Sequence, residues 1–477
     1  YTPINQLSGY TPEGNANSLE SAFNLDQQRI SSTLPSGRQT DFHAEPNGGR
    51  PTGMSFPEAD ILFTYTDSTD RAGTISRTPT NADPAQTIDY TYDGPLLTGT
   101  DFGGVASGEY AYSYDASFRL VGRSFNQGTE RQFSYDNDDL LTGIGDFSIT
   151  RSGPAGRPGV MGDGVLAVNY GFSSLGRLSD REHRVLSSDI FRIELSHDAA
   201  GRISNKIETV EGVSTTFDYV YDPDGQLLEV RLDGVLRERY AYDVNGNRTL
   251  REIDGVGEAT TFDDQDRLLN HGGLGYVFDN DGFLTQRGAT AFSYSTRGEL
   301  LSADMGAGNE IIYSYDGWGR RVARTDSVGT TQYLYGNPGN QLLVTEVRDP
   351  DATLTHYFYD ESGSLVALER AESRYYIATD QVGTPRIITD ANGTVVKRLL
   401  FDTWGVLLTD SNPGFRLHFG FAGGLADTAT GLVRFGMRDY DPVTGRWMAR
   451  DPILYRGGQA NLYVYANNDP VNFRDPT

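Results

Sequence analysis

The chain has 477 residues, a formal net charge of −25 and no cysteine. This acidic balance argues against nucleic-acid binding, which needs a basic face to neutralise phosphates, and equally against an anionic membrane surface. The lack of cysteine excludes disulfides and cysteine-ligated zinc. The 28 tyrosines and 23 phenylalanines favour strands, and the 56 glycines fit a chain that turns often. The composition therefore predicts an all-β protein with many short strands.

The N-terminus, YTPINQLSGYTPEG, shows no initiator methionine and no charged-then-apolar signal, so we expect a fragment or a processed piece of a longer protein. No run of about 18 apolar residues predicts a membrane-spanning helix. The basic residues are nearly all arginine, since the lysines are Lys206 and Lys397. Arginine forms planar, bidentate contacts with carboxylates, so we expect Arg–Asp pairs between strands.

A short unit, aromatic-x-aromatic-Asp followed by a turn that usually contains glycine, recurs along the chain. Its spacing is 21 residues from Tyr114 to Tyr135 and again from Tyr221 to Tyr242. Degenerate copies centre on Tyr92, His197 and Phe401. The clearest copies are, in chain order, YSYDASFRLVGR (Tyr114-Asp115), FSYDNDDLLTGI (Tyr135-Asp136), YVYDPDGQLLEV (Tyr221-Asp222), YAYDVNGNRTL (Tyr242-Asp243), YVFDNDGFLTQ (Phe278-Asp279), YSYDGWGRRVAR (Tyr315-Asp316) and YFYDESGSLVAL (Tyr359-Asp360).

Each unit is typical of a β-hairpin. Aromatic residues at positions i and i+2 point to the same face of a strand. In the Asp-x-x-Gly step, the aspartate bonds to its own backbone and the glycine takes the positive φ that the turn requires. A single hairpin is unstable in water, so the hairpins must stack into one antiparallel ribbon. Because sheets twist, this ribbon should coil into a spiral shell. The stretch 146–166 (DFSITRSGPAGRPGVMGDGVL) breaks the rhythm, and we expect a longer loop there.

The repeat unit resembles the YD (Rhs) repeat, and the C-terminal segment makes the resemblance specific. Residues 420–477 are similar to the Rhs repeat-associated core. The matching residues are Gly431-Leu432, Arg438 to Asp441, Gly445 to Trp447, Asp451-Pro452-Ile453, Asn461-Leu462-Tyr463 and Asn468 to Asn472. The resemblance covers the whole chain and divides it into YD repeats at residues 1–415 and the core at residues 416–477.

Relatives with this pattern include bacterial Rhs and polymorphic toxins, the C component of insecticidal toxin complexes and the YD shell of animal teneurins. The resemblance implies a hollow β-shell that the core segment closes at one end. In the toxins the shell encloses a variable C-terminal effector. In the toxin complexes the core resembles an aspartic autoprotease that cuts the chain downstream.

Self-cleavage of this type needs two carboxylates near one peptide bond, with their pKa values split, and an arginine can hold one of them ionised. The segment RDYDPVTGRWMARD offers Asp439 and Asp451 on either side of a YDPVTG turn, with Arg438 beside them. If that hairpin brings its ends together, the two carboxylates face each other. We therefore predict Asp439 and Asp451 as the acid–base pair and Arg438 as the residue that orients them. The open alternative is that they serve turns and ion pairs. Some cores use aspartates of terminal DPxG motifs instead, and Asp475 is the candidate here.

No other pattern predicts a catalytic, cofactor or metal site. The stretches DPDG (222–225), DVNGN (243–247) and DNDG (279–282) fit hairpin turns better than calcium loops, because no bidentate glutamate follows at the twelfth position. The histidines are scattered, without HExxH spacing.

Two functions remain open at the level of sequence. In the first, the chain is the shell of a secreted toxin or toxin-complex protein, its partner being its own C-terminal effector segment. In the second, it is an extracellular or cell-surface scaffold for structure, recognition or adhesion, with no catalytic activity. Neither function requires a cofactor, nucleic acid or a membrane span; other toxin or cell-surface proteins are possible partners.

Overall fold

A computed structural model describes residues 7–12, 17–46, 49–66, 70–81 and 83–475. The all-β prediction is confirmed: 39 strands form one antiparallel sheet, in which each strand pairs with the strands before and after it in sequence. A second, four-stranded sheet follows it. The predicted boundary between residues 415 and 416 falls between these two sheets. Residues 1–6, part of the stretch on which the expectation of a processed N-terminus rests, lie outside the described residues.

The first sheet begins with β1 (Gly9–Tyr10), β2 (Leu19–Phe23), β3 (Arg29–Thr33), β4 (Gln39–Ala44), β5 (Pro51–Phe56), β6 (Ala59–Tyr65), β7 (Ala72–Pro79), β8 (Gln86–Asp93), β9 (Leu96–Gly103), β10 (Gly108–Tyr114), β11 (Leu120–Phe125), β12 (Arg131–Tyr135), β13 (Leu141–Ile144), β14 (Phe147–Thr150), β15 (Val160–Gly162), β16 (Leu166–Phe172), β17 (Leu178–Val185), β18 (Ser188–His197), β19 (Ile203–Val210) and β20 (Val213–Tyr221).

It continues with β21 (Leu227–Leu232), β22 (Val235–Tyr242), β23 (Arg248–Ile253), β24 (Val256–Phe262), β25 (Leu268–His271), β26 (Leu274–Phe278), β27 (Leu284–Arg287), β28 (Thr290–Tyr294), β29 (Leu300–Asp304), β30 (Glu310–Tyr315), β31 (Arg321–Asp326), β32 (Gly329–Leu334), β33 (Glu346–Arg348), β34 (Leu354–Tyr359), β35 (Leu365–Arg370), β36 (Ser373–Thr379), β37 (Pro385–Asp390), β38 (Val395–Phe401) and β39 (Leu407–Asp410).

The second sheet comprises β40 (Leu425–Asp427), β41 (Leu432–Phe435), β42 (Arg438–Asp441) and β43 (Arg446–Trp447). The helical segments in the described residues are short 3₁₀ turns: η1 (Pro154–Gly156), η2 (Phe421–Gly423), η3 (Leu454–Gly457) and η4 (Ala466–Asn468). None of them is long and apolar enough to cross a bilayer. The stretch 146–166 is only partly the predicted loop, because it contributes β14 and β15 on either side of η1.

Each repeat closes through its aspartate, as the turn between β20 and β21 illustrates. The Asp222 carboxylate accepts the Gln226 N–H at 2.8 Å, and the two residues also bond through their backbones at 3.0 Å. Gly225 adopts φ +92°, a conformation that costs glycine little. The hairpin-turn interpretation of DPDG is thereby confirmed.

Many repeat tyrosines connect their hairpin to the one before it. The Tyr242 hydroxyl donates to the Leu227 carbonyl at 2.8 Å, and the Tyr135 hydroxyl donates to the Leu120 carbonyl at 2.9 Å. The ladder register shifts at each such tyrosine, for example between Ala241 and Tyr242. Such bulges bend a strand and increase its twist. One bulge per repeat therefore curves the ribbon continuously.

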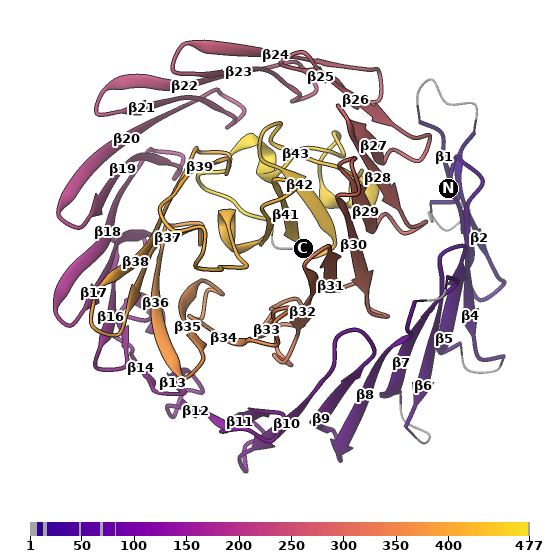
Figure 1. Cartoon of the computed structure of the whole chain (residues 1–477), viewed down its shortest axis with the longest axis horizontal. Coiled ribbons are helices and arrows are strands. Elements are labelled where there is room, and N and C mark those ends of the chain that lie inside the picture. Colours follow the sequence, from indigo (N-terminus) through magenta and orange to yellow (C-terminus); the bar gives the residue numbers. More distant parts are fainter. Residues whose placement is uncertain (1–6, 13–16, 47–48, 67–69, 82, 476–477) are drawn as a thin grey trace.

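The curved ribbon winds past itself as a spiral, so that the second winding, from the turn after β26 to β39, lies inside the first winding, β1 to β26 (Figure 1). Hydrogen bonds between the two windings show that the number of residues in one winding decreases along the chain. Bonded residues are 245 positions apart for Ser36 and Asp281, 178 apart for Glu208 and Arg386, and 151 apart for Arg251 and Asp402. Each winding thus takes fewer residues toward the C-terminus.

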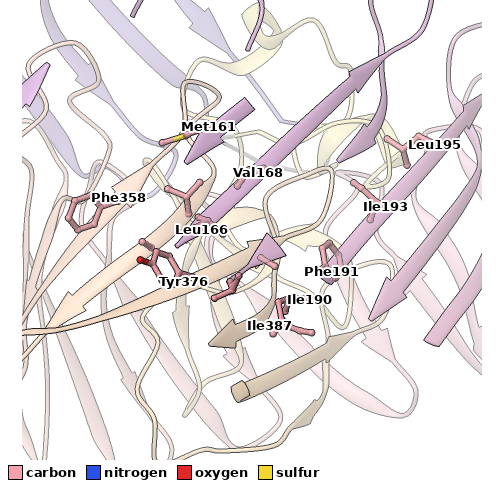
Figure 2. Close-up of a cluster of buried hydrophobic side chains, with 14 of the residues drawn as sticks. Met161, Leu166, Val168, Ile190, Phe191, Ile193, Leu195, Phe358, Tyr376 and Ile387 are labelled. Carbon is pink, nitrogen blue, oxygen red and sulfur yellow. The ribbon is translucent and has the colours of Figure 1, made fainter. Parts of the chain in front are cut away.

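The main hydrophobic core lies between the two windings of the spiral rather than within one hairpin. Figure 2 shows Leu166, Val168 and Ile193 of the first winding in one cluster with Phe358 and Ile387 of the second winding. The burial of this apolar surface, at about 25 cal/mol per Å², therefore stabilises the second winding inside the first.

The interface between the turns also holds buried ion pairs. Arg77 of the first turn binds Glu299 of the second through two N–H···O bonds of 2.8 and 2.7 Å, and both side chains are almost fully buried. Although burial alone would raise the pKa of Glu299, the charges of Arg77 and Arg297 and the hydrogen bonds from Arg77 and Ser295 together outweigh burial and lower that pKa to about 2. The glutamate is therefore ionised throughout the physiological range.

We predict that Glu299→Gln lowers the free energy of unfolding at pH 7 by about 3–5 kcal/mol, because it leaves Arg77 buried without its counter-ion. The folded pKa lies below the ordinary value of 4.5, so the wild-type advantage is complete above pH 4.5 and disappears as pH falls toward 2. Urea unfolding at several pH values measures this difference. Glu194→Gln, which breaks a half-exposed pair with Arg192, is the control and should cost less than about 1 kcal/mol. Equal losses in the two variants would contradict the prediction.

Glu238 in the same interface predicts the opposite pH dependence. Its carboxyl accepts the Tyr240 hydroxyl at 2.6 Å and the Thr403 N–H at 3.3 Å, but burial and the charge of Asp402 raise its pKa to about 7. Stability should therefore fall as pH rises from 4.5 to 7, by about 3 kcal/mol for this group. Glu238→Gln should be more stable than wild type at pH 8 and nearly equal at pH 4.5, as measured by denaturant unfolding. A pH-independent difference would refute the assignment.

Candidate functional site

The C-terminal segment, coloured yellow, lies inside the spiral (Figure 1). Its YDPVTG stretch forms the predicted tight turn: the Asp441 carboxylate accepts the Val443 N–H at 3.0 Å, and Gly445 takes φ +69°. The turn pairs Tyr440 with Trp447 across β42 and β43. Asp441 is therefore a turn residue, as expected, and it also faces Arg287 at 3.3 Å.

Aromatic rings hold this segment together. Tyr440 and Tyr465 are completely buried, with ring centroids 4.4 Å apart, and Phe435 and Trp447 pack around them. The Tyr440 hydroxyl donates to the Trp404 carbonyl in the turn between β38 and β39 at 2.8 Å. This contact ties the second sheet to the inner winding of the spiral.

Three asparagines anchor the rest of the segment to turns of the first winding. The Asn461 amide donates to Asn247 Oδ1 at 2.7 Å, and the Asn468 amide donates to the Gly246 carbonyl at 2.7 Å. Asn472 donates to the Tyr221 hydroxyl at 2.9 Å and accepts the Ile203 N–H at 2.7 Å. The asparagines of the NLY and NDPVN motifs therefore recognise the repeats themselves, a role that local sequence patterns did not predict.

Asp439 is held by two arginines from different parts of the chain. Its carboxylate accepts a 2.9 Å bond from Arg321 on β31 and a 2.7 Å bond from Arg434 on β41. The side chains of all three residues are at most 5% exposed. This arrangement neutralises Asp439 and joins the second sheet to the second winding.

Arg438, the neighbour of Asp439, bridges two other carboxylates. Its guanidinium lies 3.0 Å from Asp451 and 2.8 Å from Asp475, and it stacks 4.1 Å from the centroid of the Trp447 ring. Burial lowers the pKa of Arg438 below its ordinary value. Asp451 also accepts the Ile453 N–H at 2.9 Å, which starts the turn leading into η3.

The structure therefore does not bring the predicted pair together in the expected way. Successive residues of a strand point to opposite faces, so Arg438 and Asp439 diverge. Arg438 and Asp451 meet as expected, whereas Asp439 turns toward Arg321 and Arg434. The second carboxylate at the arginine is Asp475 instead. A catalytic role for Asp439, Asp451 or Arg438 stays a prediction.

A cavity of about 530 Å³ opens beside this arginine and is lined by Arg438, Asp451 and Asp475 together with Leu462 and Phe473. Arg474 holds the chain end in place by donating to the carbonyls of Val382, at 3.2 Å, and Ser362. The last described residue, Asp475, is thus positioned at the wall of the cavity. The continuation Pro476-Thr477 of the possible DPxG motif lies outside the described residues.

We predict that Asp439→Asn and Asp451→Asn differ sharply in stability. Asp439→Asn should lower the free energy of unfolding by about 3–5 kcal/mol, because Arg321 and Arg434 then share no buried counter-ion. Asp451→Asn should cost about 1 kcal/mol, since Arg438 keeps Asp475 as a partner. Chemical denaturation followed by tryptophan fluorescence measures both. A larger loss for Asp451→Asn would overturn this assignment of roles.

Comparison with known proteins agrees with the fold and the motifs. The family model for the Teneurin YD-shell matches residues 4–471. Teneurin-3 of Mus musculus is 32% identical over 432 residues, covering 86% of this chain and 16% of that protein. Teneurin-m of Drosophila melanogaster is 35% identical over 393 residues, covering 78% of this chain and 14% of that protein. The chain therefore spans about a sixth of the length of these relatives.

Two solved structures share the fold at lower sequence identity. The crystal structure of TcdB2-TccC3 is 16% identical and superposes with a TM-score of 0.76 over 97% of this chain and 28% of that chain. The crystal structure of TcdB2-TccC3 without hypervariable C-terminal region is also 16% identical, with a TM-score of 0.77 over 97% of this chain and 27% of that chain. On the family model and the spiral sheet of YD hairpins, the chain belongs to the Teneurin YD-shell family.

Proposed function

We propose that this chain is the shell of a longer, secreted protein that holds its own downstream C-terminal segment, an effector or toxin, at the Arg438 cavity. The observation that carries the proposal is the position of Asp475, whose carboxylate Arg438 binds at 2.8 Å at the wall of the cavity. Whatever follows Asp475 in the full protein starts from a fixed point inside the shell. The partner of the shell is then its own chain.

The superposed toxin structures support this proposal. One of them lacks the hypervariable C-terminal region of TccC3 and still superposes over 97% of this chain. The match to this chain therefore does not depend on that region. A replaceable segment downstream of Asp475 is consistent with the same plan.

We further propose that Asp451 and Asp475 are the carboxylates of an aspartic-type self-cleavage. Two carboxylates on one guanidinium carry a net charge of −1, so one shared proton is accommodated at low electrostatic cost. The ionised carboxylate takes a proton from water as the water oxygen bonds to the carbonyl carbon of the peptide. The protonated carboxyl then donates a proton to the leaving amine as the C–N bond breaks, leaving a free carboxyl and a free amine. Asp439, neutralised by Arg321 and Arg434, is then a positioning residue that fixes β42.

A second candidate function is a non-catalytic extracellular scaffold for structure or cell-surface recognition. It is favoured by the ordinary structural duties of the same residues, since Asp451 caps a turn and Asp439 completes buried ion pairs. In that case the contact between Arg438 and Asp475 is a latch that fixes the direction in which the chain leaves the shell.

The test is expression of the full-length protein as wild type, Asp451→Asn and Asp475→Asn, with the exposed Asp138→Asn as control, followed by intact-mass analysis and N-terminal sequencing of the fragments. We expect wild type and Asp138→Asn to yield two fragments split downstream of Asp475, and the other two variants to stay whole. An uncut wild type would exclude self-cleavage and would favour the non-catalytic extracellular scaffold. Cleavage that persists in Asp475→Asn would exclude Asp475 as the second carboxylate and return that role to the original candidate, Asp439.

A further inference from the structure

A second cavity lies away from the Arg438 site, between the two windings of the spiral. Its volume is about 340 Å³. The first winding contributes β14 to β17, and the second contributes the turn after β34 and Gln381 in the turn after β36. The stretch 146–166, which interrupts the repeat rhythm, thus supplies one wall. The regular YD repeats that build the shell do not require this interruption, so its residues are candidates for another role.

Most of the wall is apolar. Ile149, Met161 and Leu178 line the cavity together with the rings of Tyr170 and Phe172. Met161 is 1% exposed and belongs to the main interlayer cluster, so this wall is held rigidly. A pocket of this size and lining suits the hydrocarbon body of a small molecule.

Arg181 on β17 adds one buried positive charge to this apolar wall. It is 3% exposed and lines the cavity. One terminal nitrogen donates to the backbone carbonyls of Thr379 and Asp380, whereas Nε–H has no acceptor. Within the part of the chain that the structure describes, no carboxylate forms an ion pair with it. A buried cation in this state is energetically costly unless an anion joins it.

The other charged groups of the cavity are already engaged. Asp360 accepts the Tyr170 hydroxyl at 3.1 Å and the N–H groups of Ser362 and Ser364, both at 2.9 Å. Glu361 forms an ion pair with Arg151. Arg157 also lines the cavity and donates to the Gly176 carbonyl. Because Glu361 is paired with Arg151 outside the lining, Arg181 and Arg157 face the single remaining carboxylate of Asp360. The cavity therefore combines an apolar interior with one positive charge more than its unpaired carboxylate balances.

We propose that this cavity binds a small organic carboxylate with an apolar body, with its carboxylate on Arg181. A guanidinium matches a carboxylate in geometry, and a monoanion loses less hydration than a phosphate dianion on entering an apolar pocket. The ligand would bridge the two windings, because its anionic end contacts the first winding beside the Thr379–Gln381 turn of the second. This cavity shares no lining residue with the Arg438 cavity.

The test uses octanoate and 1-octanol as probes of the 477-residue chain, with binding followed by calorimetry and saturation-transfer NMR. Octanoate should bind wild type at least about tenfold more tightly than octanol, the difference that a charge-assisted hydrogen bond contributes. Arg181→Met keeps the length of the side chain and removes its charge, so it should lose this preference. Its melting temperature without ligand should equal or exceed that of wild type, because an unpaired buried charge has been removed.

Two further variants complete the design. Leu178→Trp fills the cavity while leaving Arg181 intact, and it should abolish octanoate binding. Arg184→Met, on the same strand but paired with Asp189 at the surface, is the matched control and should bind as wild type does. Absence of octanoate binding at millimolar concentration, or unchanged binding in Arg181→Met or Leu178→Trp, would overturn the proposal.

Discussion

The hydrogen bond from a repeat tyrosine to the carbonyl that begins the preceding return strand is the constraint on which the spiral depends. It recurs from Tyr135 to Leu120, from Tyr242 to Leu227 and from Tyr315 to Leu300, at 2.6–2.9 Å. The bond spans the sheet from one hairpin to the next, and the ladder register shifts at the same residue. Each of these repeats therefore bends the ribbon in the same direction. A backbone bulge alone would bend the ribbon, but the hydroxyl also fixes how far each hairpin advances.

A ribbon that keeps bending in one direction must eventually meet itself. Because the spiral narrows, the second winding lies inside the first and packs against it. The inner face of the first winding finds the second winding rather than water, so residues that are only half-buried within one hairpin become core. Polar residues at this interface then need partners across it. Arg77 finds Glu299, whereas Glu238 finds only hydrogen-bond donors and keeps a raised pKa. Acid therefore weakens this interface at Glu299, and a rise of pH from 4.5 to 7 weakens it at Glu238.

Sequence alone predicted the parts of this architecture that are local. Aromatic alternation, the Asp-x-x-Gly turns and their spacing of about 20 residues depend on neighbours in sequence. The site was predicted less well, because it depends on which turns of the spiral lie side by side. Arg321 meets Asp439 across 118 residues, a separation set by the circumference of the winding and not by any motif. One local rule argues against the predicted arrangement: adjacent residues of a strand point to opposite faces, so Arg438 and Asp439 do not serve the same partner.

The asparagines of the C-terminal segment connect the completed spiral to the Arg438 cavity. Asn461 and Asn468 bind the turn at Gly246 and Asn247, and Asn472 binds Tyr221, all in the first winding. Asp439 binds Arg321 in the second winding. The segment that carries Arg438, Asp451 and Asp475 therefore reaches its observed position only when both windings are in place. Any chemistry or latch at Asp475 is in this way conditional on a closed shell, since an incomplete spiral offers neither the asparagine partners nor the arginine that orients β42.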